Sequence, residues 1–125
     1  MSLEEKFQVL SVEFQKLQST LAAAIEKRER LEAQLSENEL VKKEFATLTS
    51  ENTVFKLIGP VLVKQEQSEA KSNVNTRIDF IRSELKRVEG QITETETKQE
   101  KTKQELVAIQ TTIQQQAQQP QQVQV

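Results

Sequence analysis

The sequence predicts a mainly α fold: a long antiparallel two-helix coiled coil with one central β-hairpin that joins an intersubunit β-barrel. Three observations predict this fold. Two heptad stripes of equal length occupy the two halves of the 125-residue chain. A short β-branched segment that contains a Gly-Pro pair separates them. Only 35% of residues are hydrophobic and 29% are charged, which suits a narrow apolar stripe better than a thick core.

The first apolar stripe begins at Leu3 and returns in alternating steps of four and three residues as far as Phe45. All of its positions are apolar except three: Arg28, Asn38 and Lys42. We interpret these three as residues that set the helix register or extend their polar ends to water. An apolar repeat of 3.5 residues that is kept over several heptads is typical of a coiled-coil seam. An amphipathic helix packed on a globular protein has an apolar repeat closer to 3.6 residues. We therefore expect residues 1–48 to form the first coiled-coil helix.

A second stripe with the same steps runs from Val74 to Gln116, and each stripe spans 42 residues (45 minus 3, and 116 minus 74). Because the two stripes are equal in length and a reversing segment joins them, we expect the helices to lie antiparallel. Residues 68–116 are predicted to form the second coiled-coil helix. Beyond it, residues 117–125 are Gln-rich and lose the repeat, which predicts a disordered tail.

The segment 52–66, NTVFKLIGPVLVKQE, predicts a β-hairpin with strands at 53–57 and 61–65 joined by Gly59 and Pro60. Its apolar side chains alternate onto both faces, and an isolated two-stranded hairpin is marginal in water and has two open edges. We therefore expect hairpins from several chains to join in a common sheet or barrel. A packed cap that belongs to one subunit is the less favoured alternative. The predicted assembly residues are Val54, Phe55, Leu57, Ile58, Val61, Leu62 and Val63.

The composition argues against catalysis and against ligand chemistry. Histidine and cysteine are absent and only two glycines exist, so we expect no catalytic site, no metal, no cofactor and no phosphate-binding loop. The net charge is −2, and positive and negative residues are interleaved along the chain. This pattern predicts neither nucleic-acid binding nor attraction to an anionic membrane. The start, MSLEEKFQVL, is unlike a secretory leader, and the longest apolar run is LAAAI. A cytoplasmic protein is expected.

Three blocks of the chain resemble a known family. They are LEAQLSENELVKKEF, NTVFKLIGPVLVKQEQSEAKSNV and RIDFIRSELKRVE, which lie within residues 31–89. In these blocks the chain is similar to the β-type subunits of prefoldin, and within that family to the group of eukaryotic sixth subunits. The hairpin motif VFKLIGPVLVKQE is specific, whereas in the helical arms only the heptad pattern matches.

The resemblance implies a hexamer of two α-type and four β-type subunits, with the hairpins in a double β-barrel and six coiled coils extending from it. It implies an ATP-independent cochaperone that captures unfolded chains of the actin and tubulin class at the coiled-coil tips. The captured chains would then pass to the cytosolic chaperonin. Carried onto this sequence, the substrate-binding tips lie at the two ends of the chain.

The sequence of the two ends independently favours such tips. Val9, Val12 and Val107 are apolar but lie off the stripes, and the polar run Thr95, Gln99 and Thr102 weakens the seam before the free end. Each valine alone could be an ordinary surface residue. The predicted substrate-binding residues are Leu3, Phe7, Val9, Leu10, Val12, Leu106, Val107, Ile109 and Ile113.

A structural coiled-coil adaptor or tethering subunit is the alternative function. It explains both stripes equally well, but it leaves the apolar hairpin without a purpose. It also predicts a dimer in place of a mixed hexamer, so the mass of the native assembly discriminates the two.

Overall fold

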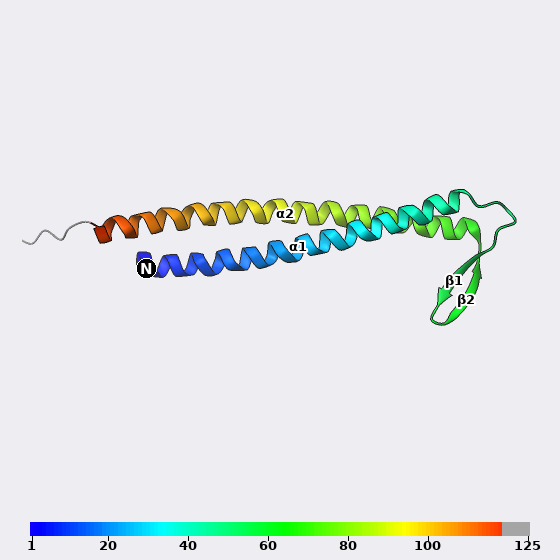
Figure 1. Cartoon of the computed structure of the whole chain (residues 1–125), viewed down its shortest axis with the longest axis horizontal. Coiled ribbons are helices and arrows are strands. Elements are labelled where there is room, and N and C mark those ends of the chain that lie inside the picture. Colours follow the sequence, from blue (N-terminus) through cyan, green and yellow to red (C-terminus); the bar gives the residue numbers. More distant parts are fainter. Residues whose placement is uncertain (119–125) are drawn as a thin grey trace, which may run out of the picture. The chain divides into compact units, whose positions relative to one another are not determined.

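The computed structural model describes residues 1–118 and contains two long helices with one hairpin between them (Figure 1). Helix α1 spans Leu3–Ala46, strand β1 spans Val54–Ile58, strand β2 spans Val61–Gln65, and helix α2 spans Gln67–Gln118. The predicted order of elements is therefore found. Helix α2 continues two residues into the stretch expected as a tail, and residues 119–125 of that stretch lie outside the described residues.

The chain divides into two compact units, and both helices contribute to each. The terminal unit contains residues 1–25 and, of 90–125, the part that the structure describes. The hairpin unit contains residues 26–89. Within each unit α1 and α2 run antiparallel (Figure 1).

In the terminal unit the core is a single seam between the two helices. Its buried side chains are Leu10, Ile92, Thr95, Thr102 and Ile109. The other predicted stripe positions of this unit are half-buried, apart from Gln116, which is exposed. At the start of α1, the Oγ of Ser2 accepts a hydrogen bond from the backbone N–H of Glu5 at 3.1 Å, which caps the helix.

In the hairpin unit the two helices also pack along a seam. Its buried side chains are Leu31, Ala70, Ile78, Ile81, Leu85 and Val88. Two ion pairs cross between the helices, Lys27 with Glu84 at 3.6 Å and Arg82 with Glu39 at 3.0 Å. Of the polar positions predicted on the first stripe, Arg28 and Asn38 are half-buried and Lys42 is exposed.

The turn of the hairpin contains two residues, Gly59 and Pro60, and the first strand ends later than predicted. Strand β1 begins at Val54 and ends at Ile58, one residue later than the expected 53–57, because Ile58 pairs directly with Val61 across the turn. Gly59 has a φ of 58° and no other residue in the described part of the chain has a positive φ. A positive φ followed by the negative φ of Pro60 is the pattern of a type II′ turn, which matches the natural twist of a hairpin.

Neither of the two helices within residues 1–118 is both long enough and apolar enough to cross a membrane.

Candidate functional site

The seven predicted assembly residues form what we call the hairpin surface: Val54, Phe55, Leu57, Ile58, Val61, Leu62 and Val63. The strand register places Leu57 opposite Leu62 on one face, together with Phe55. The other face carries the pair Ile58 and Val61 together with Val54 and Val63. Only Val54 is half-buried, and Leu57 and Leu62 are 67% and 64% exposed.

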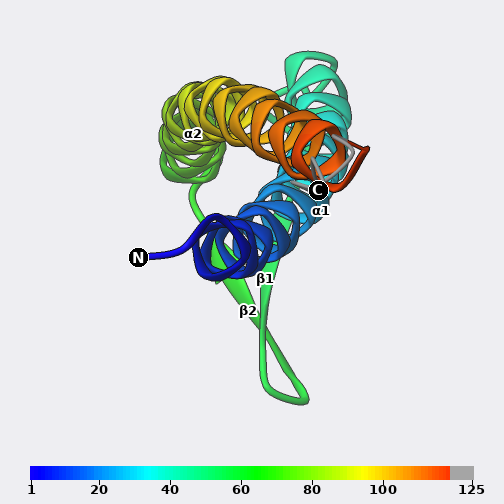
Figure 2. The same cartoon turned by 90° about the vertical axis from the view of Figure 1, so that its left-hand side faces the viewer.

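Both faces and both edges of the hairpin are open. The hairpin stands away from the helices of its own unit in two perpendicular views (Figure 1 and Figure 2). The sheet contains only β1 and β2 within the described chain, so one side of each strand has backbone groups without a neighbouring strand. Such an edge is a template for pairing with another strand, and exposed apolar faces require cover. The geometry therefore suits addition of this hairpin to a larger sheet.

A hydrogen-bonded clasp connects the base of the hairpin to the first turn of α2. The side-chain amide of Gln67 donates to the carbonyl of Thr49 at 2.6 Å and to the carbonyl of Asn52 at 2.8 Å. The Oδ1 of Asn52 accepts from the backbone N–H of Thr49 at 2.7 Å and from its hydroxyl at 3.2 Å. The sequence did not predict this clasp. Asn52 could have signalled a local turn, but nothing near Gln67 indicated that it reaches 18 residues back along the chain.

The nine predicted substrate-binding residues fall into two groups in the terminal unit. Six lie on the seam and are buried or half-buried: Leu3, Phe7, Leu10, Leu106, Ile109 and Ile113. Three are exposed by half or slightly more: Val9, Val12 and Val107. Val9 and Val12 also line a shallow groove on α1 with Gln8, Glu13 and Lys16. The three valines are thus the most exposed of the nine residues in this conformation.

Polar side chains interrupt the seam of the terminal unit at the predicted positions. Thr95 and Thr102 are buried, at 8% and 6% exposure, and Gln99 is half-buried. The hydroxyl of Thr102 donates back to the carbonyl of Lys98 at 2.9 Å, so its hydrogen bond is made inside α2 and adds nothing between the helices. This part of the seam therefore holds the two helices together less strongly than an apolar sequence would.

A group of three charges lies in the hairpin unit. Arg87 donates to both carboxylate oxygens of Glu84, at 3.2 and 2.8 Å, and Lys27 lies 3.6 Å from the same carboxylate. The hydrogen bond from Arg87 lowers the pKa of Glu84 below its ordinary value, and Lys27 contributes in the same direction. Because Lys27 is on α1, the group joins the two helices.

No cluster of acidic, histidine or cysteine side chains suited to a metal ion occurs in the chain as far as Gln118.

Comparisons with known proteins agree with this arrangement. Residues 8–119 match the sequence model of the family described as Prefoldin subunit. The chain is 44% identical over 108 residues to "Prefoldin subunit 6" of Homo sapiens, a match that covers 86% of this chain and 84% of that protein. It is 41% identical over 103 residues to "Prefoldin subunit 6" of Saccharomyces cerevisiae, covering 82% of this chain and 90% of that one.

A solved structure shows the same fold. The prefoldin beta subunit from Thermococcus strain KS-1 superimposes with a TM-score of 0.76, over 82% of this chain and 90% of that chain. The two sequences are 17% identical, so this likeness concerns the fold alone.

Proposed function

Because this chain belongs to the prefoldin family, we propose that it is one subunit of a hexameric cochaperone that captures unfolded polypeptides without ATP. The hairpin surface, which is open on both faces and at both edges, carries this proposal. The family implies that other α-type and β-type subunits cover it by adding their own hairpins to a shared barrel. The energetic reason is that each apolar side chain so covered stabilises the assembly by about 1 to 3 kcal/mol.

Client capture is assigned to the terminal unit. Val9, Val12 and Val107 expose apolar surface while the helices are packed. Separation of the helices between Thr102 and the free end of the unit would add the six seam residues to this surface. Contacts of this kind are weak and non-directional, which suits a client without a fixed shape. Several subunits acting together would convert weak contacts into avid binding. Clients of the actin and tubulin class would be held in the cytoplasm and passed to the cytosolic chaperonin.

The assembly role is tested by placing charges on the hairpin surface. In the variant Phe55→Asp with Leu62→Asp, we expect the chain to stop copurifying with the other subunits, because two carboxylates would be buried in the shared sheet. The matched control is Phe80→Asp with Leu40→Asp, which changes a phenylalanine and a leucine that are each 64% exposed on the helices of the same unit. Intact hexamers in the hairpin variant would move the assembly surface elsewhere.

The capture role is tested separately on assembled hexamers. Replacement of Leu3, Phe7, Leu106 and Ile109 by serine is expected to abolish suppression of client aggregation, while the hexamer, held by the hairpins, stays intact. Normal suppression by this variant would overturn the assignment of the tips. A dimer bound to one folded partner, in place of any hexamer, would favour the coiled-coil adaptor.

A further inference from the structure

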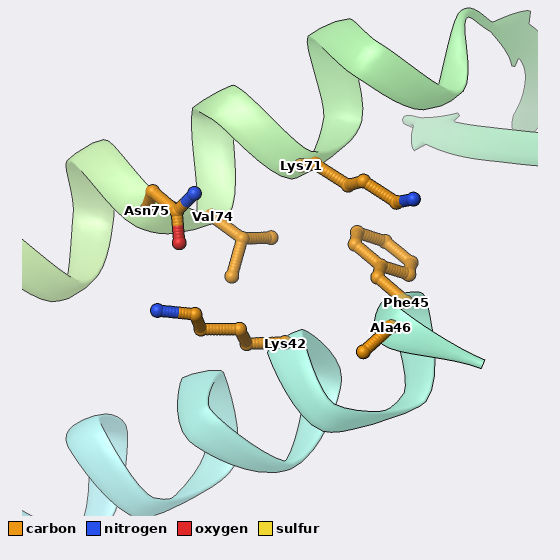
Figure 3. Close-up of a pocket in the computed structure, with 6 residues that line it drawn as sticks. All are labelled: Lys42, Phe45, Ala46, Lys71, Val74 and Asn75. Atoms are coloured by element: carbon orange, nitrogen blue, oxygen red, sulfur yellow. The ribbon is translucent and has the colours of Figure 1, made fainter. Parts of the chain in front are cut away.

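A small apolar pocket lies in the hairpin unit, between the last turns of α1 and the first turns of α2 (Figure 3). Its volume is about 150 Å³. Six residues line it: Lys42, Phe45, Ala46, Lys71, Val74 and Asn75. A cavity of this size in another protein holds one benzene molecule, so the pocket has room for one aliphatic or phenyl side chain.

The floor of the pocket is apolar and its rim is basic. In Figure 3 the side chain of Val74 points toward α1, where Phe45 and Ala46 complete the floor. The ammonium group of Lys42 lies at the Asn75 side and that of Lys71 lies at the opposite side, toward the strands (Figure 3). The two cations therefore flank the apolar floor.

Neither cation is neutralised within residues 1–118. No ion pair is formed there by Lys42 or by Lys71. The free carbonyl groups at the C-terminal end of α1 could also attract the lysines, but two of them already accept hydrogen bonds. The carbonyls of Glu44 and Phe45 accept from the backbone N–H groups of Thr47 and Leu48, at 3.1 and 3.2 Å. The lysines therefore remain available to carboxylates from outside the chain.

We propose that this pocket binds an acidic segment of a partner protein, in which one apolar side chain is flanked on both sides by carboxylates. The apolar side chain would fill the pocket, and the flanking carboxylates would pair with Lys42 and Lys71. A basic segment would be repelled by both lysines, and a wholly apolar one would desolvate two ammonium groups without a partner. The chain's own final residues, QPQQVQV, contain no Asp or Glu and do not match this chemistry.

The pocket is separate from the surfaces assigned to assembly and to client capture. It contains none of the hairpin-surface residues, and it lies in the hairpin unit, whereas the predicted substrate-binding residues all lie in the terminal unit. If the pocket binds no acidic segment, the proposed function is therefore unaffected. If the proposed function is wrong, binding at the pocket can still be tested.

The test is binding of a fluorescein-labelled pentapeptide, a central phenylalanine with two aspartates on each side, to the full chain by fluorescence anisotropy at low salt. We expect saturable binding that weakens as salt rises. Lys42→Gln with Lys71→Gln should weaken binding about tenfold, since exposed ion pairs each contribute a few-fold. Ala46→Leu, which fills the pocket and keeps both charges, should weaken it to a similar extent. Helical circular dichroism confirms that each variant is folded.

Matched controls separate the pocket from general attraction between charges. Lys101→Gln with Lys103→Gln makes the same change in net charge at two exposed positions of α2 in the terminal unit, and it should leave binding unchanged. Peptides with asparagine in place of aspartate, or alanine in place of phenylalanine, should bind at least tenfold more weakly. Absence of binding by the original peptide would overturn the proposal. Equal binding by either altered peptide would overturn it too, as would equal weakening by the control pair. If binding were lost only when Val9 and Val12 are replaced, the peptide would bind in the terminal unit, which would contradict the proposal. If the chain self-associated and Ala46→Leu abolished that association, the pocket would bind a second copy of the chain, which would contradict it as well.

Discussion

The side-chain amide of Gln67 lies 2.6 Å from the carbonyl oxygen of Thr49 and joins the first turn of α2 to the loop that enters the hairpin. A second bond from the same amide reaches Asn52 at 2.8 Å. Both connections depend on one side chain, so we expect Gln67 to help hold the hairpin in place within its unit.

Loss of this amide should loosen the hairpin. Gln67→Met keeps the length of the side chain but removes the donors, and we expect a cost of about 1 kcal/mol because both bonds are partly solvated. Hydrogen exchange of the amides in β1 and β2 should become faster. Gln110→Met, at an exposed position in the terminal unit, is the control. Unchanged exchange in the hairpin of Gln67→Met would show that the clasp does not hold it.

The two glycines should respond to alanine in opposite directions. A Cβ at Gly90 would meet no atom within 4 Å, and this glycine lies inside α2, so Gly90→Ala should stabilise the chain by about 1 kcal/mol. A Cβ at Gly59 is also free of contacts, but its φ of 58° is costly for alanine, and Gly59→Ala should destabilise the hairpin by about 1 to 2 kcal/mol. Thermal unfolding followed by circular dichroism measures the first change. Hydrogen exchange in the strands measures the second, and equal signs for both variants would contradict the account.

Removing the buried hydroxyl of Thr102 should close the terminal unit more tightly. In Thr102→Val a methyl group replaces a hydroxyl that bonds only within α2, so the seam should gain about 1 kcal/mol. If client capture requires the helices to separate, the hexamer that carries this variant should suppress aggregation less well. Thr111→Val removes an equivalent bond, to Val107 at 2.9 Å, from an exposed position and serves as the control. Unchanged capture by Thr102→Val would mean that the exposed valines suffice.

The three-charge group around Glu84 should make the free energy of unfolding depend on pH in the acidic range. The pKa of Glu84 in the folded chain lies below its ordinary value of 4.5 because Arg87 and Lys27 favour the carboxylate. Its contribution is therefore fully present above about pH 4.5, and it is lost as the pH falls through the folded pKa. In Glu84→Gln this part of the pH dependence should disappear, which urea unfolding at a series of acidic pH values would measure. Glu105→Gln, an exposed position without an ion pair within residues 1–118, is the control, and the same change in pH dependence there would contradict the assignment.

The heptad pattern predicted most of this fold because burial in a coiled coil follows sequence spacing directly. Every stripe position except Lys42 and Gln116 is buried or half-buried, and the resemblance based on the hairpin motif agrees with the family match. Strand β1 was misplaced by one residue, since only the pairing of Ile58 with Val61 fixes where it ends. Ala70, at 4% exposure, was missed because it lies off the stripe.

Contacts between segments distant in the sequence could not be predicted in this way. The clasp of Gln67 and the pocket between Phe45 and Val74 depend on how the chain returns after the hairpin. The spacing does separate Leu3, on the first stripe, from Val9, which lies off it, and the structure agrees: Leu3 is half-buried on the seam and Val9 is 55% exposed.

If the open hairpin joins a shared barrel, this chain is one subunit of a mixed hexamer. The most direct test is the native mass spectrum of the complex that copurifies with the tagged chain from its own cells. We expect a six-subunit particle composed of distinct small coiled-coil chains. A homodimer, or a complex with a single large folded partner, would contradict it.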